Sequence, residues 1–221
     1  MTRTKSPIVA GMSMYQDKIL PRIQDKVMNR KANTAIRERV CAGLSGDVVE
    51  VGFGTGLNAP HYPSEVHKIL AVEPSDLCMR IAGPRIASTE VAVERAGLTG
   101  ESLDLPTGHF DGVLSTWTLC TIPDIDAALQ ELLRVLKPGG VFHFVEHGRS
   151  PDETVRRWQH RIEPVQKRIG GGCHLTRRIA ESIEEAGFQM EKLDTYYFEG
   201  VPKPFGYTFE GLARKTSARP T

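Results

Sequence analysis

Residues 48–63 read VVEVGFGTGLNAPHYP, and this stretch decides the fold. An apolar run leads into a loop with glycine at every second position, namely Gly52, Gly54 and Gly56. Glycine lets the backbone turn sharply and lets a ligand approach it without an intervening side chain. The pattern predicts a buried strand followed by a ligand-binding loop.

Three further apolar runs, at residues 69–72, 112–115 and 141–145, are continuous rather than alternating. Continuous apolar runs are typical of strands covered on both faces, as in a parallel sheet. Residues 124–136 carry apolar side chains at helical spacing, and Asp124 is expected to cap that helix. Alternating strands and helices predict a doubly wound α/β sheet, which binds ligands beyond the carboxyl ends of its strands.

The rest of the chain predicts additions to this sheet. Residues 190–198 and 207–214 read as two strands of an antiparallel C-terminal hairpin. Ser150 to Glu153 resembles a capping box with Pro151 at the first helical position, and another helix is expected from about Thr176 to Ala186.

The expected domain division is simple. Residues 1–40 form an N-terminal helical extension that acts as a lid, and residues 41–221 form one domain with a helical insertion at about 150–175. In the extension, Leu20, Ile23 and Val27 form a helical stripe that is expected to pack on the core.

Composition excludes several classes of protein. The 221 residues carry a net charge of +1, which argues against a nucleic-acid-binding surface. The four cysteines lack CxxC spacing and are expected to be buried or free thiols in a reducing compartment. The histidines lack HxH or HExxH spacing, so no metal site is expected. Without a transmembrane run or a signal peptide, a soluble cytoplasmic protein is expected. The oligomeric state stays open.

The ligand of the glycine loop is first judged from nearby carboxylates. Residues 54–59 also fit the GxGxxA form of a dinucleotide loop, which keeps an NAD-dependent oxidoreductase open. Glu50, however, would repel a pyrophosphate, and it is expected either to orient the loop or to meet the cationic amino group of S-adenosylmethionine. Glu73 ends the next strand, where a carboxylate accepts hydrogen bonds from ribose hydroxyls in both kinds of site. Glu101 and Ser102 are placed to recognise adenine.

Five segments then carry a resemblance: VVEVGFGTGLN, AVEPS, GESLDLP, FDGVLSTWTLCTI and LKPGGVFHFVEHG, in order over residues 47–148. Together they resemble class I S-adenosylmethionine-dependent methyltransferases. The resemblance implies a Rossmann-like sheet of seven strands whose last strand is antiparallel. The residues expected to bind the cofactor are Glu50, Gly52, Gly54, Gly56, Asn58, Glu73, Pro74, Glu101, Ser102, Thr116 and Trp117.

A narrower resemblance follows from FVEHG, a helix containing Trp158, and GGGCHLTRRIAESIEEAGF. These are similar to the methyltransferase-like alkyl-thiol methyltransferases and their bacterial relatives, and also to ubiquinone/menaquinone-type methyltransferases. The animal members' hydrophobic N-terminal anchor is not seen, so peripheral membrane contact is the most that is expected. The resemblance implies methyl transfer to a small molecule, with a thiol preferred. An amine, phenol, quinone or phospholipid headgroup, and a non-catalytic cofactor-binding protein, remain open.

Candidate catalytic residues lie at the expected ligand edge. His147 follows the fourth strand and is a candidate base or acceptor-orienting residue, although a structural histidine is the alternative. Cys173 and His174 follow three glycines and are candidates on a loop that closes over the substrate, or else a buried thiol and a capping neighbour. Cys120 is interpreted as core or pocket wall. Residues expected to contact substrate or form the lid are Tyr15, Trp117 and Trp158.

Overall fold

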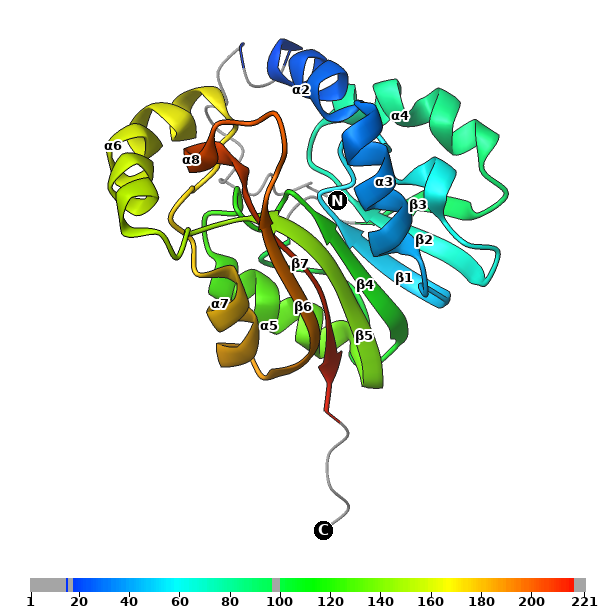
Figure 1. Cartoon of the computed structure of the whole chain (residues 1–221). Coiled ribbons are helices and arrows are strands. Elements are labelled where there is room, and N and C mark those ends of the chain that lie inside the picture. The colour runs from blue at the N-terminus through cyan, green and yellow to red at the C-terminus, as the bar shows by residue number, and fades with distance from the viewer. Residues whose placement is uncertain (1–14, 16–17, 97–99, 217–221) are drawn as a thin grey trace, which may run out of the picture.

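A single twisted sheet forms the centre of the computed structural model, which describes residue 15, residues 18–96 and residues 100–216 (Figure 1). The sheet has seven strands in the order β3-β2-β1-β4-β5-β7-β6. The strands are β1 (Gly46–Val51), β2 (Val66–Val72), β3 (Ala92–Arg95), β4 (Phe110–Thr116), β5 (Leu136–His147), β6 (Phe188–Tyr197) and β7 (Tyr207–Lys215).

The sheet topology confirms the predicted class. β1 to β5 pair in parallel, whereas β7 runs antiparallel to both β5 and β6. Strand order reverses between β1 and β4, which is where doubly wound sheets bind their ligands. Val51 is in register with Val72 of β2 and with Ser115 of β4, so the three strands end together. The residues that follow these strands therefore meet at one edge.

Helices cover both faces of the sheet (Figure 1). Val49 and Val51 pack on one face in a cluster that includes Leu129 and Ile183, whereas Val48 packs on the other face with Ile36. The alternation follows from the period of two along a strand. The helices are α2 (Leu20–Met28), α3 (Lys31–Cys41), the 3-10 helix η2 (Ala59–His61), α4 (Asp76–Ser88), α5 (Ile125–Val135), α6 (Glu153–Ile169), α7 (Ile179–Glu185) and α8 (Lys203–Gly206).

The residue that caps α5 is the one predicted from the sequence, whereas the residue that caps α6 is not. The carboxylate of Asp124 accepts the N–H of Ala127 and caps α5 as predicted. The predicted capping box at Ser150 is wrong, because α6 is capped by Asp152, whose carboxylate accepts two first-turn N–H groups. A carboxylate there also meets the positive end of the helix dipole. The Ser150 hydroxyl instead accepts the N–H of Asp152.

The next helix also begins later than predicted, at Ile179 rather than near Thr176. Both the N–H and the hydroxyl of Thr176 donate to the carboxylate of Glu163, at 2.8 Å and 2.7 Å, so Thr176 belongs to the preceding loop. Four elements had no sequence prediction: the short edge strand β3, helix α4 and the short helices η2 and α8.

The N-terminal extension is described from residue 18, with Tyr15 before it, so part of the predicted lid lies outside the described residues. The Tyr15 hydroxyl donates to the carbonyl of Ile169 at the end of α6. Leu20 is buried, but Ile23 and Val27 are 46% and 44% exposed, so only part of the predicted stripe packs inward. In the described part of the chain, none of the helices combines the length and apolar composition needed to cross a bilayer.

Candidate active site

The glycine loop after β1 has three residues with left-handed backbones, Gly52, Gly54 and Gly56. A Cβ at Gly52 would collide with the side chain of Thr118, and one at Gly56 would lie 3.1 Å from the Cβ of Ala82. At Gly54 the nearest atom to such a Cβ would be the carbonyl oxygen of Gly52, 3.7 Å away. Packing therefore requires glycine at Gly52 and Gly56, whereas Gly54 leaves an open face that a ligand can approach.

Glu73 joins this loop to the end of β2. Its carboxylate accepts the N–H of Gly54 at 2.9 Å and the N–H of Ser75 at 2.7 Å. Burial raises the pKa of Glu73, while these two hydrogen bonds oppose that rise. The carboxylate predicted to meet the cofactor thus also fixes the backbone of the loop.

A buried polar network underlies the loop. Asn58 donates to the Glu50 carboxylate at 2.9 Å and to the Thr116 hydroxyl at 3.0 Å. Tyr62 donates to the other carboxylate oxygen of Glu50, and Arg37 donates to the Asn58 side-chain oxygen at 2.6 Å. Burial raises the pKa of Glu50 to about 7. The structure therefore brings together three residues predicted to bind the cofactor, Glu50, Asn58 and Thr116.

Arg37 and Tyr62 were not predicted for this site. Arg37 comes from α3, and its buried guanidinium lies 4.9 Å from the centre of the Trp117 ring. Burial lowers the pKa of Arg37 to about 10, a value at which the side chain stays charged at neutral pH. The residues around Arg37 form no binding motif, so the sequence carried no signal for it.

Trp117 directly follows β4 and has a left-handed backbone, with φ of +52°. A bulky residue rarely adopts this conformation, and such strain clusters at functional sites. Within the described residues, the indole N–H of Trp117 and the Nε–H of Arg37 are buried donors without a hydrogen-bond partner. Buried donors of this kind mark a place where a ligand can supply the acceptors.

Three other predicted cofactor residues lie nearer the surface. The Glu101 carboxylate accepts the N–H of Asp124 at 3.3 Å, and Ser102 is exposed. Pro74 is exposed, and its carbonyl accepts a hydrogen bond from Arg95. Their roles in binding the cofactor stay predictions.

A second group of predicted residues meets at the ends of β4 and β5. His147 and Cys173 lie together with Cys120, and their ligand atoms are all within 4.8 Å of one another. Hydrogen bonds from Cys120 and His147 lower the pKa of the Cys173 thiol. The ring centres of His147 and Trp117 are 6.3 Å apart, which joins this cluster to the edge where the strands end.

Cys120 is buried, as predicted, but the sequence did not indicate its place beside Cys173. All four cysteines are free and buried, as predicted. His174 lies outside the cluster, because the Nδ1 atom of its ring is 3.9 Å from the Glu163 carboxylate. The backbone N–H of His174 donates to the backbone carbonyl of Cys120.

Glu146, at the end of β5, binds the loop that carries Cys120. Its carboxylate accepts the N–H groups of Thr118, Leu119 and Cys120 at 2.9 Å, 3.0 Å and 3.2 Å, and also the hydroxyl of Ser115. Glu146 therefore holds the loop that carries Cys120.

The two predicted lid residues outside this edge lie on or against α6. Tyr15 bonds to the last residue of that helix, Ile169. Trp158 is 52% exposed, and the guanidinium of Arg161 lies 5.5 Å from the centre of its ring. Trp158 is thus on the solvent side of α6, and its part in a lid stays a prediction.

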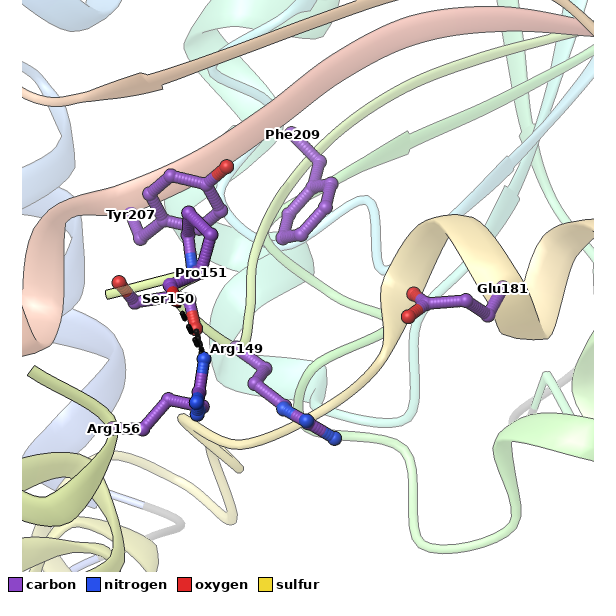
Figure 2. A pocket seen from close by; sticks show the side chains of 7 residues that line it. All are labelled: Arg149, Ser150, Pro151, Arg156, Glu181, Tyr207 and Phe209. Atoms are coloured by element: carbon purple, nitrogen blue, oxygen red, sulfur yellow. Dashed lines mark hydrogen bonds between the residues drawn. The ribbon is translucent and has the colours of Figure 1, made fainter. Parts of the chain in front are cut away.

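A separate surface cavity of about 220 Å³ has no predicted site residue in its lining. Figure 2 shows the rings of Tyr207 and Phe209 on β7 and the Glu181 carboxylate on α7. The rest of the lining comes from the loop after β5 and the start of α6: Arg149, Ser150, Pro151 and Arg156.

Comparison with known proteins decides the family. Residues 49–144 match the model of a methyltransferase domain. The chain is 34% identical to rat thiol S-methyltransferase TMT1B over 81% of this chain and 74% of that protein. It therefore belongs to the methyltransferase family that includes TMT1B.

Other similar proteins are more distant. Demethylmenaquinone methyltransferase of Thermobifida fusca is 25% identical over 79% of this chain and 68% of that protein. The structure of a SAM-dependent methyltransferase of Thermotoga maritima, described as a possible histamine N-methyltransferase, has a TM-score of 0.61 at 22% identity. That match covers 88% of this chain and 94% of the other, and it shows the same fold.

The methyltransferase is an enzyme that uses S-adenosylmethionine, so the NAD-dependent and non-catalytic alternatives are set aside. The residues present fit this cofactor. Its methionine carboxylate offers acceptors for the buried donors of Arg37 and Trp117. The open face at Gly54 beside the Glu73 carboxylate fits a ribose that donates its hydroxyls.

Proposed function

We propose that this methyltransferase transfers the methyl group of S-adenosylmethionine to the sulfur of a small thiol. The observation that carries the proposal is the match to thiol S-methyltransferase TMT1B over 81% of the chain. The cluster of Cys120, His147 and Cys173 beside Trp117 supports it, because that cluster lies where the strands end.

In the proposed cofactor site, each residue has a distinct task. Glu73 accepts the ribose hydroxyls and holds Gly54, whose open face admits the ligand. Arg37 and Trp117 donate to the methionine carboxylate, and Glu50 contributes negative charge near the amino group.

The cofactor supplies a methyl group already activated by its bond to a sulfonium sulfur. The protein's remaining tasks are to align the acceptor with that methyl group, to exclude water and to stabilise the acceptor as a thiolate, since the thiolate is the nucleophile. Trp117 is proposed to line the acceptor pocket, between the cofactor site and His147.

The test compares acceptors that differ in one atom. Release of S-adenosylhomocysteine is measured with an alkanethiol and the matching alkylamine, and with a thiophenol and the matching phenol. Turnover is expected only with the thiols, and it should rise with pH as the thiolate forms. A Glu73→Gln variant controls for background, because it should bind the cofactor weakly. Turnover with amines or phenols but not with thiols would reject the proposal.

A second candidate is methylation of a quinol ring carbon, favoured by the similarity to demethylmenaquinone methyltransferase. The same assay with a reduced naphthoquinone as the acceptor separates the two reactions. An enzyme specific for thiols releases no S-adenosylhomocysteine with this acceptor, whereas a C-methyltransferase does.

A further inference from the structure

The cluster of Cys120, His147 and Cys173 has the composition of a metal site. Each residue contributes one ligand atom, and these atoms all lie within 4.8 Å of one another. In a tetrahedral zinc site, with bonds of roughly 2.0 Å to nitrogen and 2.3 Å to sulfur, neighbouring ligand atoms are about 3.3–3.8 Å apart. Side-chain movements of about 1 Å therefore close the cluster around an ion.

We propose that Cys120, His147 and Cys173 bind a zinc ion whose fourth position receives the sulfur of the acceptor. Thiolate and imidazole ligands favour zinc over magnesium or calcium. Three protein ligands and one open position are the pattern of catalytic zinc sites, whereas structural sites use four protein ligands. The role of the open position rests on the proposed thiol substrate, but the metal site itself does not.

The backbone around the cluster is held in place before any ion binds. Glu146 holds the loop that carries Cys120 through three N–H groups of that loop. The N–H of His174 donates to the carbonyl of Cys120 at 2.8 Å, which ties the two cysteine loops together. Outer groups that fix ligands in this way raise the affinity of metal sites.

Glycine permits the close approach of these two loops. Gly172 has φ of +92°, and a Cβ there would lie 3.1 Å from the carbonyl oxygen of Thr121. A larger residue next to Cys173 would strain the backbone and push the loop away from Cys120.

His147 is the accessible member of the cluster. Cys120 and Cys173 are buried, at 1% and 5% exposure, whereas His147 is partly exposed and its ring neighbours Trp117. We therefore place the open position on the Trp117 side, where the proposed acceptor pocket lies.

The reaction balances without a further reactant. The acceptor thiol loses its proton to solvent as its sulfur binds the ion, because zinc favours the thiolate. A lone pair of that sulfur then forms a bond to the methyl carbon, and the bond from methyl to sulfonium breaks with its electron pair left on the departing sulfur. The products are a thioether, S-adenosylhomocysteine and one proton. His147 is thereby a ligand rather than the base expected from the sequence.

The test measures the metal directly. Wild-type protein is titrated with Zn²⁺ and, separately, with Co²⁺, whose absorption reports thiolate ligands. We expect one ion per chain and a thiolate-to-cobalt charge-transfer band. Cys120→Ser, Cys173→Ser and His147→Gln should each weaken binding by roughly a hundredfold, since each removes one of three ligands. Cys41→Ser is the matched control, because Cys41 is a buried thiol outside the cluster and should leave binding unchanged.

Thermal unfolding and S-adenosylmethionine binding verify that each variant is folded. Folded wild-type protein that binds neither ion, or an unchanged cobalt spectrum in the Cys120→Ser and Cys173→Ser variants, would overturn the site. Thiol turnover that is equal with and without the ion would overturn its catalytic role and leave the proposed function intact. A bound ion in a protein that methylates no thiol would support the site and reject the proposed function.

Discussion

Arg37 of α3 donates a hydrogen bond of 2.6 Å to Asn58 in the loop after β1. This contact joins the N-terminal helices to the proposed cofactor site, and the guanidinium also lies over Trp117. The site is therefore built from α3 as well as from the edge of the sheet.

Replacing Arg37 should affect both stability and cofactor binding. Arg37→Ala leaves the buried oxygen of Asn58 without this donor, so the free energy of unfolding should fall by about 2–3 kcal/mol. The affinity for S-adenosylmethionine should fall by roughly tenfold, the equivalent of one lost hydrogen bond to a charged group. Urea denaturation and calorimetric titration measure the two effects.

Arg39→Ala is the matched control on the same helix. Arg39 forms an ion pair with Glu210 on β7, but the Arg39 side chain is 55% exposed. The free energy of unfolding should therefore change by less than about 1 kcal/mol. Cofactor affinity should stay unchanged. Equal losses of affinity in both variants would contradict a specific role for Arg37.

The buried Glu50 should make stability depend on pH. Its pKa is raised from 4.5 to about 7 by burial, so the folded state favours the protonated form. The contribution of protonated Glu50 to the free energy of unfolding is fully present below pH 4.5 and is lost as pH rises through 7. The total loss is about 3 kcal/mol. Relative to Glu50→Gln, the wild-type free energy of unfolding should therefore fall between pH 5 and pH 8. A constant difference across that range would show that Glu50 does not titrate there.

The loop glycines should differ in what their substitution damages. Gly52→Ala introduces a collision with Thr118 as well as left-handed strain, so it should destabilise the fold by about 3 kcal/mol or more. Gly54→Ala meets only the strain, roughly 1–2 kcal/mol, but it places a methyl group on the open face. It should fold and bind S-adenosylmethionine poorly. Normal binding by a folded Gly54→Ala protein would show that the cofactor does not approach there.

The stripe on α2 predicts another contrast. Leu20 is 7% exposed and Ile23 is 46% exposed, so Leu20→Ala should cost about 2 kcal/mol and Ile23→Ala about 0.5 kcal/mol or less. Hydrogen exchange of the α2 amides measures both changes, because local opening of this helix sets their protection. Comparable loss of protection in the two variants would mean that α2 does not pack through Leu20.

The sequence predicted the parts of the site that follow directly from strand ends. Glu73 comes directly after β2 and Trp117 directly after β4, so the parallel register brings them to one edge. Glycines at alternate positions likewise predicted the loop. The antiparallel C-terminal hairpin was also predicted from the sequence pattern, whereas its place in a sheet of seven strands came from the family resemblance.

Contacts between distant segments could not be predicted. Arg37 reaches Thr116, 79 positions away, and nothing in the α3 sequence indicates that contact. Cys120 and Cys173 meet only because a glycine loop folds back on the end of β4. The N-cap of α6 was missed for the same reason. Ser150 and Asp152 are both good capping residues, and the hydrogen bond between the Ser150 and Tyr197 hydroxyls favours Asp152 as the cap.

The strand order also constrains the path of folding. β7 follows β6 in the chain, yet it lies between β5 and β6 in the sheet, and among the strands that the structure describes β6 pairs with β7 alone. β6 therefore cannot add to the growing sheet when it is synthesised. It joins the sheet only through β7, either as part of a preformed hairpin or by pairing with β7 once β7 has paired with β5. Completion of this edge thus waits for β7, the last strand in the chain, and until β7 pairs the edge of β5 remains open to incorrect partners.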